Sequence, residues 1–346
     1  MRLLLTGHQG YLGTVMAPVL VAAGHEVVGL DSGLFADCVL GPPPQDPPGL
    51  TVDLRDVEPE HLAGFDAVVH LAALSNDPLG SLAPRITYDI NQHASTRLAR
   101  LAKEAGVTRF LYASTCSVYG AAGGGALVAE DAPLRPVTPY AESKVRVEEE
   151  IFALADGDFC PVSLRNATAF GFSPRLRADI VLNNLVGRAV LTGEVRVLSD
   201  GTPWRPLVHA ADIAAAFTAA LDAPAAAVQS RAFNVGSEQN NVTVAEIADA
   251  VVATVPGSTL AITGEAGADP RSYRVDFSAA RAALPGFEAR WSILDGAREL
   301  YEKYRTHGLT SEAFDRRFTR LARLGDRQGA GELSADMHVL AAPVGA

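Results

Sequence analysis

Tyr140 and Lys144 lie four residues apart in a segment with helical periodicity, so their side chains share one helix face. An ammonium group beside a phenol favours the phenolate and lowers the pKa of the tyrosine toward neutrality. The pair could therefore exchange a proton with a carbinol as a general base or acid. Only three of the 29 basic residues are lysines, so chance is a poor explanation for a tyrosine and a lysine at this spacing. The alternative interpretation is an exposed structural pair on a helix.

A turn near the start of the chain has glycines at three-residue intervals, at Gly7, Gly10 and Gly13, directly after an apolar strand. Glycine lets backbone N–H groups approach a pyrophosphate, and the following helix start offers partial positive charge. Asp31 ends the next strand, 18 residues beyond Gly13, where its carboxylate can bind the ribose and repel a 2′-phosphate. The pattern predicts NAD rather than NADP. The one reservation is His8 in the turn, a residue that could bind the 2′-phosphate of NADP.

Further cofactor contacts are expected where later strands end. Asp53 closes the third predicted strand and could reach the adenine amino group, and small residues after the fourth strand would let a dinucleotide lie against it. Lys144 would also bind the nicotinamide ribose. The candidate cofactor residues are Gly7, Gly10, Tyr11, Leu12, Gly13, Asp31, Asp53, Leu54, Leu71, Ala72, Ala73, Tyr140 and Lys144.

Short Val/Leu-rich runs alternate with longer helical segments through about residue 170, which is typical of βαβ units. Strands are expected at 2–6, 26–30, 50–53, 66–71, 109–114 and 161–165, and helices at 11–23, 91–105 and 138–155. The predicted fold class is α/β, a doubly wound Rossmann parallel sheet with a smaller, interleaved C-terminal substrate-binding region.

The expected organisation has three parts. Residues 1–170 would form the dinucleotide-binding domain, which also receives about 205–236, and residues 171–204 and 237–300 would form the substrate-binding region. Residues 301–346 would be a helical tail, with a solvated arginine-rich face over about 296–325 and a frayed end over 329–346. The proline-rich stretch 41–48 is expected to be a surface loop.

The composition restricts the function classes. Of 346 residues, 48% are hydrophobic and 20% charged, a globular composition, and the net charge of −11 without a basic stripe argues against nucleic acid as a partner. Cys38, Cys116 and Cys160 have neither disulfide nor metal-ligand spacing, so no metal is expected. No apolar run is long enough for a signal peptide or a membrane span, which predicts a cytoplasmic location.

Taken together, these motifs resemble the extended short-chain dehydrogenase/reductase family of NAD-dependent nucleotide-sugar epimerases and dehydratases. The resemblance covers most of residues 1–300. Besides the glycine turn and Asp31, it is carried by the segments His70-Leu71-Ala72-Ala73, Asn91, Ser114-Thr115-Cys116-Ser117-Val118-Tyr119-Gly120, Pro139-Tyr140-Ala141-Glu142-Ser143-Lys144 and Trp204-Arg205-Pro206-Leu207-Val208-His209-Ala210-Ala211-Asp212.

The resemblance implies that Thr115 is the third catalytic residue, hydrogen-bonded to the reacting oxygen, with Ser114 as the fallback. Sugar 4,6-dehydratases of the family carry Asp-Glu after this threonine, whereas Cys116 and Ser117 stand here, so dehydration is disfavoured. Epimerases that use a cysteine place it at the position of Ser117, so Cys116 is interpreted as a core residue.

The resemblance also implies a nucleotide diphosphate sugar as substrate, bound by an asparagine and two arginines. Thr168 stands at the usual asparagine position, with Asn183 further on, and Arg205 matches the first arginine. The usual context of the second arginine is replaced at residues 265–267, which leaves Arg271 as the candidate. The candidate substrate-binding residues are Ser75, Thr115, Thr168, Asn183, Arg205 and Arg271.

The predicted function is NAD-dependent epimerisation of a nucleotide-activated sugar through a transient keto intermediate. The first alternative is a dehydrogenase or ketoreductase acting on a sugar or a secondary metabolite with an exchangeable nicotinamide cofactor. A remote alternative is a non-catalytic dinucleotide-binding protein on the same fold. The helices 91–105 and 138–155 resemble those that form the homodimer contact in the family, although they could equally cover one face of the sheet.

Overall fold

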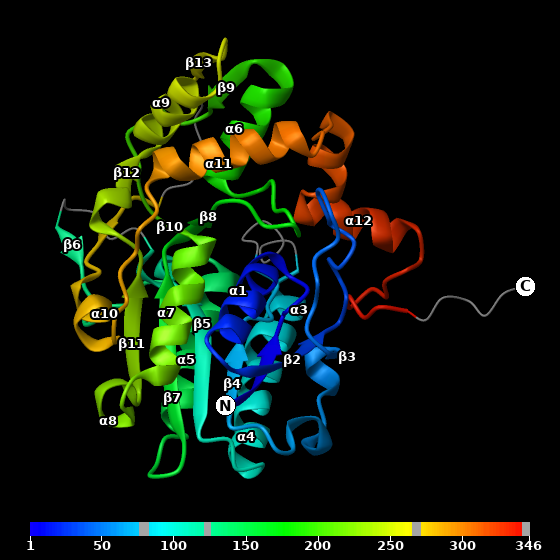
Figure 1. The fold of residues 1–346 in the computed structure, drawn as a ribbon, viewed down its shortest axis with the longest axis vertical. Coiled ribbons are helices and arrows are strands. Elements are labelled where there is room, and N and C mark those ends of the chain that lie inside the picture. Colours follow the sequence, from blue (N-terminus) through cyan, green and yellow to red (C-terminus); the bar gives the residue numbers. More distant parts are fainter. Residues whose placement is uncertain (76–82, 121–125, 265–270, 341–346) are drawn as a thin grey trace, which may run out of the picture.

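A parallel sheet of seven strands forms the centre of the computed structural model, which describes residues 1–75, 83–120, 126–264 and 271–340 (Figure 1). The strand order is β11-β7-β5-β4-β1-β2-β3. Since the chain moves outward from β1 to β3 and then restarts at β4 on the other side of β1, the sheet is doubly wound, as predicted. The strands are β1 Arg2–Thr6, β2 Glu26–Asp31, β3 Gly49–Thr51, β4 Ala67–His70, β5 Arg109–Thr115, β7 Cys160–Asn166 and β11 Arg231–Val235.

Two apolar clusters fill the two faces of this sheet. On one face, helices α1 (Tyr11–Ala22) and α7 (Ala210–Asp222) pack against each other and bury Leu20 and Phe217. On the other face, α4 (Ser95–Glu104) and α5 (Pro139–Phe152) bury Leu98 and Ile151. Helices α1, α4 and α5 overlap the segments expected from helical periodicity, whereas α7 was not among the expected helices.

A second region lies over the carboxyl ends of the central strands. Its core is formed by α6 (Val181–Thr192), α9 (Val244–Thr254) and α11 (Ile293–Thr306), which bury apolar residues against small sheets. The small sheets are β12-β10-β8, β13-β9 and β14-β6. Their strands are β6 Leu127–Val128, β8 Thr168–Phe170, β9 Glu194–Val197, β10 Trp204–His209, β12 Asn241–Thr243, β13 Thr259–Ile262 and β14 Arg274–Val275.

Shorter helices connect these elements. They are η1 Leu54–Asp56, η2 Pro59–Leu62, α3 Pro84–Tyr88, η3 Asp89–Ala94, η4 Cys116–Tyr119, α8 Ala225–Val228, η5 Glu238–Asn240, α10 Ser278–Ala283, η6 Ala313–Arg317 and α12 Arg320–Gly329. The helix expected over 91–105 begins as η3, a π-helical turn that continues directly into α4. Within the part of the chain that the structure describes, no helix has both the length and the hydropathy to cross a bilayer.

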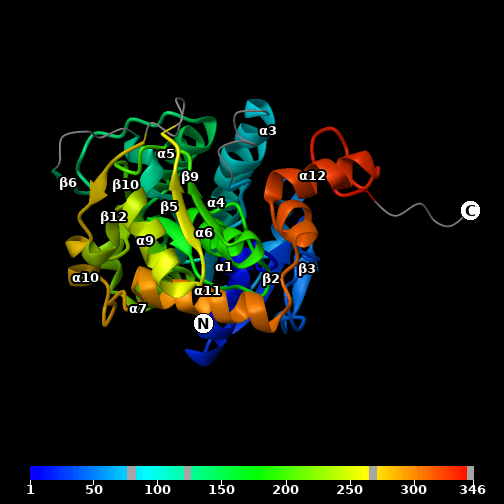
Figure 2. The ribbon, with the colours of Figure 1, turned by 90° about the horizontal axis from the view of Figure 1, so that it is seen from above.

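The arginine-rich face of the tail is not solvated throughout, so that expectation is wrong for Arg320, and Arg327 just beyond the expected stretch is buried as well. Arg320 and Arg327 on α12 are 5% and 8% exposed, because the helix lies against the loop that follows β2. Figures 1 and 2 show α12 beside the β2 and β3 edge of the molecule. The frayed end expected over 329–346 is instead ordered where the structure describes it, because Leu333 and Met337 are buried and Leu333 pairs with Val339. Residues 341–346 lie outside the described residues.

Candidate active site

The glycine turn between β1 and α1 is so tight that only glycine fits at two positions. Gly7 has a φ of +76°, and a Cβ on Gly13 would lie 2.1 Å from the carbonyl oxygen of Gly7. The helix start therefore sits directly against the strand end, with the backbone amides of Tyr11 and Leu12 in the first turn of α1. Such a turn suits the pyrophosphate of a dinucleotide.

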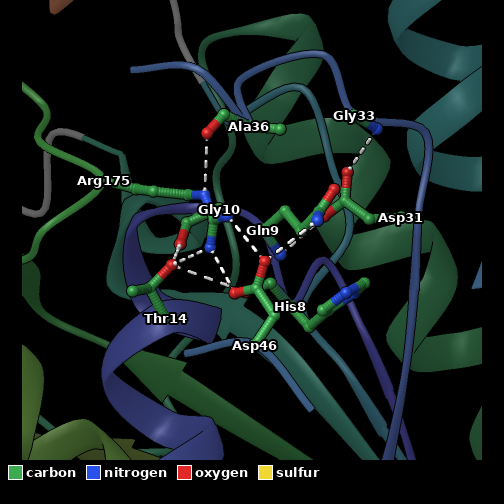
Figure 3. Close-up of polar contacts among 9 residues, drawn as sticks. All are labelled: His8, Gln9, Gly10, Thr14, Asp31, Gly33, Ala36, Asp46 and Arg175. Carbon is green, nitrogen blue, oxygen red and sulfur yellow. Dashed lines mark hydrogen bonds and ion pairs between the residues drawn. The ribbon is translucent and has the colours of Figure 1, made fainter. Parts of the chain in front are cut away.

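Asp31 at the end of β2 faces this turn (Figure 3). Its carboxylate accepts hydrogen bonds from the backbone amides of Gln9, at 3.0 Å, and Gly33, at 2.8 Å. Burial raises the pKa of Asp31, whereas the hydrogen bonds from Gly33 and Gln9 oppose this shift. The carboxylate thus lies at the edge of the turn, where a ribose hydroxyl would find an acceptor.

His8 does not extend toward a phosphate position. Its side chain is 4% exposed, and a Cβ added to Gly29 would lie 2.4 Å from the imidazole ring, while one on Gly49 would lie 3.0 Å from Nε2. The ring therefore packs against strands β2 and β3 through gaps that glycines leave. This placement removes the reservation that His8 would bind a 2′-phosphate.

The proline-rich loop is tied to the glycine turn by an ion pair that sequence reasoning did not anticipate (Figure 3). Both carboxylate oxygens of Asp46 accept from the guanidinium group of Arg175, at 2.6 and 2.7 Å, and one also accepts from the side-chain amide of Gln9. Arg175 donates further to Thr14 Oγ1 and to the carbonyl oxygen of Ala36. One arginine thus connects the loop, the turn and the first turn of α1.

The remaining cofactor candidates lie at the same edge of the sheet. Asp53 already holds Arg55 through both carboxylate oxygens, at 2.8 Å each, and Arg55 donates to the carbonyl oxygen of Asp336 in the tail. Leu54 is buried beside it. After β4, the amide of Ala72 donates to Thr6 Oγ1, which fixes the strand end next to the turn.

Helix α5 positions the tyrosine and the lysine. Thr138 caps its N-terminus by accepting from the amide of Ala141, and Pro139 occupies the first helical position. One turn beyond Tyr140, Lys144 Nζ donates to the carbonyl oxygen of Ala113 on β5 at 2.7 Å. The same nitrogen lies 5.7 Å from the centre of the Tyr140 ring.

Lys144 is only 3% exposed, and burial lowers its pKa to about 7, against the opposing charge of Glu148. From the sequence alone, Lys144 is expected to be an ammonium group. In the protein without cofactor, the structure instead indicates an amine that titrates near neutral pH, because desolvation disfavours the charged form.

The hydroxyl groups and the thiol at the end of β5 differ in accessibility. Thr115 is half-buried, and its Oγ1 accepts from the amide of Ser117 at 3.1 Å, which leaves its own proton available for donation. Ser114 is 3% exposed and lies on the opposite face of the strand. Cys116 is buried, donates to the carbonyl oxygen of Arg165, and has a pKa raised by burial.

Two of the substrate candidates meet near this strand end. Arg271 donates to Ser117 Oγ at 3.3 Å, and Arg205 on β10 hydrogen-bonds the carbonyl oxygen of Arg271. Thr168 is half-buried on β8, whose parallel partner is β10. Residues 265–267, where the usual arginine context is replaced, lie outside the described residues.

Asn183 has a different environment from these candidates. It is fully buried, and its amide group exchanges hydrogen bonds with the backbone of Gly171 and donates to the carbonyl oxygen of Arg177. Tyr11 donates to the carbonyl oxygen of the same glycine at 2.8 Å. These contacts hold the turn between β8 and α6. The hydrogen-bonding groups of the Asn183 side chain are thus occupied by the backbone of Gly171 and Arg177.

Arg177 is a site residue that sequence reasoning missed. Its guanidinium group donates to Ser75 Oγ at 3.1 Å and pairs with Asp179 at 3.0 Å. Burial lowers the pKa of Arg177, but the charge of Asp179, and then the nearby phenols of Tyr140 and Tyr11, raise it overall. The run Arg175-Leu176-Arg177-Ala178-Asp179, two arginines and an acid in a loop before a helix, was the available signal.

A tight glycine turn, a carboxylate beside it and a tyrosine paired with a buried lysine, all at one edge of a parallel sheet, define a dinucleotide-binding Rossmann enzyme. Comparison with known proteins gives the family: the model of the NAD-dependent epimerase/dehydratase family matches residues 3–236. The chain belongs to this family, and NAD is its cofactor.

Relatives agree with this assignment. The chain is 31% identical over 253 residues, 68% of its length, to the UDP-glucose 4-epimerase of Corynebacterium glutamicum, of which 75% is covered. The structure of MoeE5 in complex with UDP-glucuronic acid and NAD is similar, with 30% identity, a TM-score of 0.74 and coverage of 88% of this chain and 99% of that one. TunA, an NAD-dependent NDP-hexosamine 5,6-dehydratase, has 27% identity, a TM-score of 0.79 and coverage of 88% and 98%.

Proposed function

We propose that this protein epimerises a nucleotide diphosphate sugar through a transient keto intermediate, using one NAD for both half-reactions. The observation that carries the proposal is the placement of Lys144, which is fixed between β5 and the ring of Tyr140 at the edge that bears the glycine turn. The neighbouring Cys116 is buried with a raised pKa, which leaves the tyrosine as the acid/base at this strand end.

NAD, when bound, accepts a hydride from the substrate carbon and returns it. The residues of this chain are assigned the following roles. Tyr140 removes the proton from the reacting hydroxyl and later gives it back, Thr115 donates a hydrogen bond to the same oxygen, and Lys144 orients the nicotinamide ribose and tunes the phenol. Gly7, Gly10, Gly13 and Asp31 would hold the dinucleotide.

Arg205 and Arg271 would bind the diphosphate of the substrate. This assignment is supported by the contact of Arg271 with Ser117 of η4 and by the contact of Arg205 with Arg271. It is also supported by the complementary charges of arginine and phosphate. UDP-sugars are the first substrates to test, because the Corynebacterium glutamicum relative is a UDP-glucose 4-epimerase and MoeE5 was solved with UDP-glucuronic acid. The substrate-binding region would comprise 171–204 and 237–300. A homodimer is proposed on the family resemblance, and a cytoplasmic location on the spacing of the three cysteines, which fits a reducing compartment.

The proposal is tested with UDP- and dTDP-sugars that carry deuterium at the reacting carbon, incubated with protein and sub-stoichiometric NAD. An epimerase gives the stereoisomer with the deuterium retained and without NADH accumulation, because the same hydride returns. Both are measured in one sample, by NMR of the sugar and by absorbance of the nicotinamide.

Two other products would contradict the proposal. Net formation of NADH together with a keto sugar identifies the dehydrogenase alternative. A product that has lost one water identifies a dehydratase, the reaction in the description of TunA. The absence of the acidic pair after Thr115 argues against the 4,6-dehydratase reaction but leaves the product analysis to decide.

A further inference from the structure

The C-terminal segment of residues 317–340, here called the C-terminal clasp, closes over the loop that follows β2. Arg327 donates to the carbonyl oxygens of Gly33 and Leu34, at 3.2 and 2.8 Å, and Cys38 Sγ donates to the carbonyl oxygen of Arg317. Figure 2 shows α12 standing beside the β2 and β3 edge of the sheet. The clasp therefore lies against the segment that borders the dinucleotide turn.

An apolar cluster fastens the clasp to a second loop as well. It joins residues of the clasp to the loops that follow β2 and β4 and to η3, and its buried members are Leu34, Leu74, Ile90, Leu324, Leu333 and Met337. Because β1 lies between β2 and β4 in the sheet, a segment that contacts both loops spans the glycine turn of β1.

Arg320 is the polar residue of the clasp that this packing buries without a complete set of partners. It is 5% exposed, its guanidinium carbon lies 4.2 Å from the centre of the Phe35 ring, and its Nη1 has no hydrogen-bond partner among the described residues. A buried charged donor without an acceptor destabilises a fold unless a ligand supplies the acceptor. Phe35 comes four residues after the end of β2, which places the guanidinium group at the cofactor edge.

The charge around Arg320 favours an anion. Burial lowers its pKa to about 10 against the opposing effects of Cys38 and Asp179, and the like charge of Arg177 lowers it further. Arg177 reaches Ser75, five residues after the end of β4. Two guanidinium groups and one neighbouring carboxylate, that of Asp179, thus leave an excess positive charge between the two loops that flank the glycine turn.

We propose that Arg320 donates to a phosphate oxygen of the bound NAD, so that the C-terminal clasp is part of the cofactor site and retains the dinucleotide between turnovers. The inference depends on NAD binding and not on the epimerase reaction. Arg320 lies outside residues 3–236, which the family model matches. The substrate diphosphate is the other phosphate source, and the experiment distinguishes the two.

The experiment compares the full chain with R320M, freed of nucleotide, by calorimetric titration with NAD and separately with UDP. We expect R320M to bind NAD about 10- to 100-fold more weakly, the loss of one charge-assisted hydrogen bond, with the UDP affinity unchanged. The matched control is R317Q, an exposed arginine of the same segment, which should bind NAD as the wild type does.

Thermal unfolding separates this role from a structural one. Without NAD, R320M should be as stable as the wild type or more stable, because methionine removes an unpartnered buried charge and keeps the packing. With NAD, its melting temperature should rise less than that of the wild type. Unchanged NAD affinity, a loss confined to UDP, or a nucleotide-free variant that unfolds more readily would each overturn the proposal.

Discussion

At the scale of single residues, the placement of Lys144 most affects the chemistry. Its amine is held by the carbonyl oxygen of Ala113 and lies 4.6 Å from the centre of the Tyr112 ring, and the residue is only 3% exposed. The position of the lysine relative to Tyr140 follows from the four-residue spacing, but its burial does not. The burial comes from packing against β5, which the spacing between the tyrosine and the lysine does not predict.

Replacement of Tyr140 by phenylalanine should reduce turnover by about a hundredfold to ten-thousandfold, because the phenol is the proposed proton acceptor. NAD affinity should be kept, since the ring remains. Steady-state kinetics and calorimetric titration measure the two effects. The control is Y88F, whose hydroxyl group donates to Glu142 at the surface of the same helix. An unaffected rate in Y140F would refute the assignment of Tyr140 as the acid/base.

The titration of Lys144 should appear in the pH dependence of stability. In the unfolded chain the lysine keeps its proton up to its ordinary pKa of 10.5, whereas in the folded chain it loses the proton at about 7. The unfolded state thus binds more protons between these values, and folding becomes more favourable as the pH rises. Relative to K144M, the free energy of unfolding of the wild type should increase by up to about 1.4 kcal/mol per pH unit in this window.

Chemical denaturation of both proteins at a series of pH values measures this difference. Effects common to the wild type and K144M cancel, so the slope reports Lys144 alone. A difference that stays constant from pH 7 to pH 10 would show that the lysine titrates as it does in water.

At the scale of elements, a buried polar network fixes α5 on the sheet beneath the active site. Glu148, one turn beyond Lys144, is 2% exposed and pairs with Arg165 of β7 at 2.7 Å. Arg165 also donates to the hydroxyl group of Tyr119, which donates to Asn234 of β11. The network therefore joins the catalytic helix to two strands and to η4.

E148Q should destabilise the protein by about 3–5 kcal/mol, because it leaves the charge of Arg165 buried without its carboxylate. Denaturant unfolding measures the loss. E149Q is the matched control, since Glu149 is exposed on the same helix and should change the free energy of unfolding by less than about 0.5 kcal/mol. Equal stabilities of the two variants would contradict the importance of this ion pair.

The same scale shows what the sequence could predict. Helices α1 and α5 and strands β1, β2 and β5 were located from local periodicity and turn residues, which act within a few positions. The partners of Arg165, Arg175 and Arg320 were not predictable, because they come from elements that only the tertiary fold brings together. Composition assigns an arginine to the surface, and only the fold reveals which arginines are buried.

At the scale of the whole molecule, the inward faces of α4 and α5 restrict how two subunits could meet. Leu98 and Ile151, which lie on the two helices that resemble the homodimer contact of the family, are fully buried against the sheet. The proposed homodimer must therefore use the outward faces of α4 and α5. We expect light scattering to give twice the chain mass of 36.3 kDa at micromolar concentration. A mass of one chain would rule out this homodimer.

The contacts of the C-terminal clasp also constrain how the protein is made. The hydrogen bond from Arg327 to Leu34 joins residues 293 positions apart, and that from Cys38 to Arg317 spans 279. A nascent chain emerging from the ribosome can assemble β1, α1 and β2 early, but it acquires these contacts only once residues 317–327 have also emerged. The contacts of the clasp with the loop that follows β2 therefore form after the central strands have been synthesised.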